Sequence, residues 1–90
     1  MEDPGPAFIS EIYPNPNTGS FTLSIRSKTK ENIGIKMLNS LNIQVFEEKD
    51  WVVSGKMQRE FDFTKLPAGI YFMELERKEG IMIFKILIQK

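Results

Sequence analysis

The segment SFTLSIR, residues 20–26, alternates apolar and polar side chains over its whole length. In an extended chain Phe21, Leu23 and Ile25 fall on one face and the polar side chains fall on the other. Such a period of two is typical of a β-strand that packs one face on a core. The same period recurs along the 90 residues, and no long segment holds the period of a helix. We therefore expect an all-β protein.

Short segments of this kind are separated by polar, proline-containing or glycine-containing turns at intervals of about eight to twelve residues. Residues 27–32 are predicted as a polar turn, and residues 49–56 around Trp51 could be either a ragged strand or a loop. This spacing predicts an immunoglobulin-like antiparallel β-sandwich of about seven short strands. The strands are expected at residues 8–13, 20–26, 33–38, 43–48, 57–63, 70–77 and 81–89.

The last two of these segments are predicted to form a hairpin around the turn KEG. The final strand is apolar at nearly every position, so it is expected either to be covered on both faces or to be covered on one face and leave the other apolar face for a partner. Its end is expected to be free. Lys85 is the single charge within that run. Its ammonium could reach water or a carboxylate on the adjacent arm, such as Glu74 or Glu76, or it could mark a docking strand. An exposed edge would also allow an edge-strand dimer.

Length and composition indicate one small domain, residues 8–90, preceded by a linker or tail remnant, residues 1–7. The hydrophobic fraction of 41% and the charged fraction of 27% are ordinary for a globular domain. The formal net charge is zero, so no nucleic-acid partner is expected. No apolar run is long enough to span a membrane, and the first residues do not resemble a signal peptide.

The sequence contains no histidine and no cysteine. This excludes Ser–His–Asp and Cys–His catalysis and most transition-metal sites. The oxygen-rich segments 15–17 and 47–50 lack the spacing of a calcium loop. Paired carboxylates such as Glu74 and Glu76 fall on a face that is expected to be solvated, without the cleft that glycosidic chemistry needs. We predict no enzymatic activity, no metal and no cofactor.

Residues 13–19, YPNPNTG, form the most rigid stretch of the chain. Pro14 and Pro16 fix φ near about −65° and remove two amide donors, so the segment cannot continue a sheet. Asn15 is expected to be extended and to cap the turn with its side chain. Gly19 is expected to adopt a positive φ. A second corner lies at residues 64–69, where Gly69 is expected to play a similar part.

Three segments occur in order along the chain: YPNPNTGSFTLSI (residues 13–25), LPAGIYFMEL (66–75) and GIMIFKILIQK (80–90). Together they resemble the type A C-terminal sorting domain of the type IX secretion system, the Por secretion tail family of Bacteroidota. The resemblance covers almost the whole chain. By position, the first motif matches Pro14, Asn15, Pro16 and Gly19, the second Gly69 and Tyr71, and the final strand Lys85.

The resemblance implies an immunoglobulin-like sandwich at the C-terminus of a secreted precursor. The precursor's N-terminal cargo domain would reach the periplasm, and the outer-membrane machinery would recognise the sorting domain and export the cargo. A sortase-like protease would then remove the domain, and the cargo would be attached at the cell surface.

Two other functions are open from the residues alone. One is a carbohydrate-binding or adhesive module, which would need at least two exposed, coplanar aromatic rings. Trp51 is the side chain best suited to such a platform, although packing as a lid on the core is the better interpretation. The other is a fibronectin-like spacer between domains, which would carry no signal.

Overall fold

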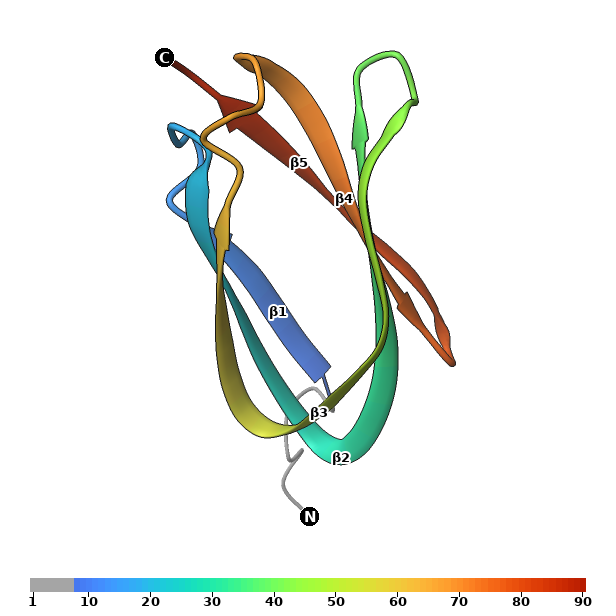
Figure 1. Ribbon diagram of the computed structural model, residues 1–90. Helices are drawn as coiled ribbons and strands as arrows, with labels where there is room; N and C mark the ends of the chain where they lie inside the picture. Colours follow the sequence, from blue (N-terminus) through green and yellow to red (C-terminus); the bar gives the residue numbers. More distant parts are fainter. Residues whose placement is uncertain (1–7) are drawn as a thin grey trace.

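The computed structural model describes residues 8–90, which form five antiparallel strands and no helix (Figure 1). The strands are β1 (Phe8–Tyr13), β2 (Ser20–Asn39), β3 (Gln44–Asp62), β4 (Gly69–Arg77) and β5 (Gly80–Ile88). Among these described residues, no helix is long and apolar enough to cross a membrane. The predicted linker, residues 1–7, lies outside the described residues.

The two long strands β2 and β3 form a hairpin that curls over on itself (Figure 1). The N-terminal half of β2 lies between β1 and β3, and its C-terminal half lies between β3 and β4. β5 continues the second half beyond β4. The two halves of this curled sheet face each other, so one hairpin contributes to both walls of the core.

The prediction of seven short strands is wrong, because the described residues form five strands. Residues 27–32 are no turn but the bend of β2, and residues 49–56 belong to β3. Residues 27–32 have the polar composition of a turn, but the strand continues through them, and since Ile25 and Ile33 are eight residues apart it points both inward. A register shift between Ser27 and Glu31 supplies the bend. The all-β antiparallel class is confirmed, whereas a seven-stranded immunoglobulin-like sandwich is not.

The inward faces agree with the predicted alternation. On β2, Leu23, Ile25 and Met37 are fully buried, and on β4 Met73 and Leu75 are too. On β5 the even-numbered side chains face the core and the odd-numbered ones face outward. Each fully buried aliphatic side chain contributes about 1.5–3 kcal/mol to folding, so this core is the main stabilising element of the domain.

Trp51 is partly buried and packs against the core, as predicted, and an aromatic cluster of four phenylalanines lies on the β3 side. The Arg59 guanidinium lies 5.2 Å from the Trp51 ring and 4.9 Å from the Phe61 ring. It also makes a bidentate ion pair with Glu48, which holds the pKa of that carboxyl below its usual range. Arg59 thus ties together the two halves of β3. The ring contacts join Phe21, Phe46, Phe61 and Phe63.

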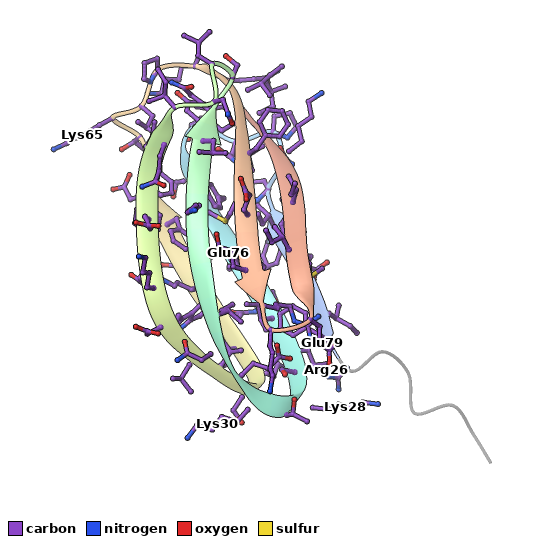
Figure 2. All side chains as sticks on the ribbon, turned by 90° about the vertical axis from the view of Figure 1, so that its right-hand side faces the viewer. Arg26, Lys28, Lys30, Lys65, Glu76 and Glu79 are labelled. Carbon is purple, nitrogen blue, oxygen red and sulfur yellow. The ribbon has the colours of Figure 1, made fainter. Side chains whose placement is uncertain are left out.

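The bend end of the molecule is closed by a second arginine. Arg77 donates two hydrogen bonds to Glu31, at 2.9 and 2.8 Å, and its guanidinium carbon lies 3.9 Å from the Phe8 ring. These hydrogen bonds lower the pKa of Glu31. Figure 2 shows that Arg26 and Lys30 lie at this end, whereas Lys65 lies at the opposite end.

Candidate functional site

The proline-rich segment lies against the outer edge of β5. We call residues 14–17 the proline strap. The Asn15 side chain donates a hydrogen bond to the Lys85 carbonyl at 2.7 Å and accepts one from the Leu87 amide at 3.0 Å. An amide side chain that donates and accepts in this way replaces a peptide group of a neighbouring strand. Asn15 therefore covers part of an edge that β4 leaves open.

Asn17 fixes the strap from inside and is 6% exposed. Its side chain donates to the Pro14 carbonyl at 3.0 Å and accepts from the Gly19 amide at 2.8 Å. Its backbone forms a parallel bridge with Ile88. The amide that caps the turn is thus Asn17 and not Asn15, which corrects the sequence-based expectation. An asparagine two residues before a glycine is the signal of such an Asx-turn, and it could have identified this residue.

Gly19 has a φ of +111°, so the prediction of a positive φ is confirmed. A Cβ atom there would lie 2.7 Å from the Phe63 carbonyl oxygen and 2.8 Å from the Thr64 Cα. The Phe63 amide donates to the Gly19 carbonyl at 2.7 Å. Only glycine allows this approach between the start of β2 and the end of β3.

The two prolines of the strap face solvent. Pro14 and Pro16 are exposed, and each follows a cis peptide bond. Their rings lie on either side of Asn15 and leave no amide hydrogen at either position. The strap therefore meets β5 through Asn15 and Asn17 and presents the proline rings to any partner at this end of the molecule.

The second corner lies next to the strap because Gly69 pairs with Ile88 at the end of β5. The φ of Gly69 is +155°. Tyr71 is only 4% exposed, and its hydroxyl donates to the Pro67 carbonyl at 2.7 Å. Tyr71 consequently holds the corner in place from the core, and a partner cannot contact its ring directly.

Lys85 is exposed on the outward face of β5, opposite Phe72 of β4. Among the described residues its ammonium forms no ion pair with Glu74 or Glu76, and Glu76 instead binds Lys36 at 3.2 Å. The expected uncovered apolar face is present too, since Ile81 and Ile83 are 58% and 64% exposed. Lys85 is thus a lone cation on a largely apolar strand face.

The end of β5 is anchored, which corrects the expectation of a free end. The Gln89 amide donates to the Asn17 carbonyl at 2.7 Å. The Lys90 ammonium donates to the carbonyls of Thr64 and Leu66 in the second corner. The strap, the second corner and the end of β5 are therefore held together by hydrogen bonds.

These contacts bring the seven predicted site residues to one region of the molecule. Six of them lie in the strap, in the adjoining corners or on the outward face of β5, and the seventh, Tyr71, lies beneath them. Across residues 8–90, no group of acidic side chains is arranged to hold a metal ion. Among the same residues Tyr13 is the one exposed aromatic side chain. The described part of the chain therefore does not form the platform of two exposed rings that a carbohydrate-binding module would need.

Comparison with protein families matches residues 11–89 to the secretion system C-terminal sorting domain, the type IX sorting signal. The chain belongs to this family. It therefore carries a C-terminal sorting signal for type IX secretion, part of a larger cargo protein that is exported to the cell surface or beyond. No curated protein matches the chain. The region built from the strap, the second corner and the end of β5 is the candidate recognition surface of this sorting domain.

Proposed function

We propose that the domain is a non-catalytic address label whose recognition surface is formed jointly by the proline strap and β5. The observation that carries this proposal is the pair of hydrogen bonds between the Asn15 side chain and the backbone of β5, one donated to the Lys85 carbonyl and one accepted from the Leu87 amide. Two motifs separated by 70 residues thereby become one surface. Four of its residues, Pro14, Asn15, Pro16 and Lys85, are exposed and open to a partner.

In this proposal the domain passes through the periplasm as part of its precursor. The outer-membrane machinery binds the folded domain at the recognition surface and moves the cargo outward. A sortase-like protease then removes the domain, and the cargo is attached at the surface. Gly19, Gly69 and Tyr71 act indirectly, because they hold the backbone of the two corners in place.

The test is an export assay with point variants. A Sec signal, a fluorescent reporter able to fold in the periplasm and residues 1–90 are fused and expressed with and without a working type IX system. The reporter is expected outside the cell only in the working strain. Deletion of the last strand is unsuitable as a test, because it also removes the buried side chains of Ile86 and Ile88.

The informative variants are Asn15→Ala and Lys85→Ala, with Lys30→Ala as the matched control. Lys30 is also an exposed lysine, but it lies at the bend end of the molecule (Figure 2). Loss of export in the first two variants, with export retained in the control, supports the proposed surface. Equal export of all three, each shown by its melting transition to be folded, contradicts it.

A further inference from the structure

The outer edge of β5 is divided into a covered part and an open part. The amide and the carbonyl of Leu87 both point away from β4, to Asn15 and Asn17. Since backbone groups on an antiparallel strand repeat their direction every two residues, those of Lys85, Ile83 and Ile81 also point outward. The Asn15 side chain of the strap donates a hydrogen bond to the Lys85 carbonyl. Within residues 8–90 no strand lies beyond β5, so the backbone of Ile81 and Ile83 and the Lys85 amide have no strand partner.

This open part differs from the other long edge of the sheet. β3 also pairs on one side only, but charged side chains and register shifts interrupt its length. Such features prevent another strand from adding to an edge. On β5, residues 81–84 carry no charge, and Ile81 and Ile83 are more than half exposed. The open part of β5 therefore lacks the protection that β3 has.

Lys85 indicates the chemistry of what covers this edge. Its ammonium follows two exposed isoleucines on the same face and has no carboxylate among the described residues. Three other basic side chains of the described residues do have one: Lys36 pairs with Glu76, Arg59 with Glu48 and Arg77 with Glu31. A partner that lies along the edge can bury the isoleucines and supply the missing negative charge.

We propose that the β5 edge from Ile81 to Lys85 is a strand-addition site for an extended segment of the secretion machinery. This segment pairs with the open backbone, packs aliphatic side chains on Ile81 and Ile83, and places a carboxylate at Lys85. The proposal rests on the proposed function and specifies how the machinery would bind the surface. The strap fixes one limit of the incoming strand, and the turn before Gly80 fixes the other.

A second copy of the chain fits this edge less well. Five residues of strand span only about 16 Å. Two identical edges of that length bury far less than the roughly 800 Å² per partner of a stable dimer. The carboxylate nearest to this edge in the sequence, Glu79, belongs to the turn and not to the strand. Charge complementarity thus favours a different protein.

The test uses the reporter fusion with four variants. Ile83→Pro removes one outward amide hydrogen but no hydrogen bond to β4, and Ile83→Lys places a charge on the edge. Ile83→Pro is expected to reduce export about tenfold or more, the effect that loss of one buried hydrogen bond has on an affinity. Ile83→Lys is expected to reduce export as much, because a charge at this position opposes strand addition. Ile83→Val keeps the amide and the β-branched side chain. Leu41→Lys introduces the same charge at Leu41, a residue in the loop between β2 and β3 that is even more exposed, at 77%.

Export that falls in the first two variants and stays within about twofold in the last two supports the proposal. Melting temperatures of the purified 90-residue variants establish that each one is folded. Normal export of Ile83→Pro overturns strand addition, even if Ile83→Lys is defective. A wild-type dimer in light scattering that Ile83→Lys converts to a monomer also overturns the proposal, in favour of a second copy. If the unmodified fusion is not exported, the proposed function itself fails.

Discussion

Replacing Gly19 by alanine should destabilise the domain by about 3 kcal/mol. A φ of +111° lies outside the region that L-residues adopt, which costs about 1–3 kcal/mol. The added Cβ would also lie 2.7 Å from the Phe63 carbonyl oxygen. The atoms it meets are backbone, so the two chains must separate. Separation weakens the hydrogen bond from the Phe63 amide to Gly19, which contributes about 0.5–1.5 kcal/mol.

The matched control is Gly55→Ala. Gly55 also has a positive φ, +68°, but a Cβ atom there would have no neighbour within 4 Å. Its cost is therefore the left-handed conformation alone, about 1 kcal/mol. In a domain of this size, 1 kcal/mol shifts the melting temperature by about 4–8 °C.

Urea unfolding, followed by the fluorescence of Trp51, gives both free energies of unfolding. In thermal unfolding, the melting temperature of the Gly19 variant should lie about 12–24 °C below that of the wild type, and that of the Gly55 variant about 4–8 °C below it. If the two variants lose the same amount, the close approach of β2 and β3 at Gly19 has no energetic consequence and the reasoning is refuted.

Three further predictions concern single side chains. Asn15→Ala should lose about 1–2 kcal/mol of stability and speed hydrogen exchange of the Leu87 amide; unchanged exchange would show that the strap does not protect β5. Tyr71→Phe should cost about 1 kcal/mol in urea unfolding, because the Pro67 carbonyl loses its donor; a neutral result would mean that water replaces the hydroxyl. Since Arg77 lowers the pKa of Glu31, the stabilisation from this ion pair is present above about pH 4.3 and is lost as the pH falls through the lowered pKa. Glu31→Gln should therefore flatten that part of the curve of stability against pH, and an unchanged curve would exclude the pair as its cause.

The inward faces of the strands could be predicted because alternation is a local property of the sequence. The run Phe21, Leu23 and Ile25 specifies its own buried face wherever the strand pairs. The bend of β2 could not be recognised in the same way, because the polar residues 27–32 have the composition of a turn. The parity of Ile25 and Ile33 was the available signal, and it is compatible with a turn as well.

In the candidate site, too, local features could be predicted from the sequence and long-range contacts could not. The stiffness of Pro14 and Pro16 and the positive φ of Gly19 follow from residue type, so the sequence predicts a corner. Which backbone groups Asn15 binds depends on contacts 70 residues away, and no local pattern encodes them. The unpaired ammonium of Lys85 likewise depends on the register between β4 and β5, which brings Phe72 and not a carboxylate opposite it.

Because hydrogen bonds join the strap to β5, the recognition surface exists only when the domain is folded. One part comes from the start of the domain and the other from its last strand, so neither exists alone. A chain whose synthesis stops before Lys85, or whose hairpin has not yet docked, cannot display the joined surface. Machinery that binds it would therefore leave unfinished or unfolded copies behind, and export would proceed only for domains that have completed their fold.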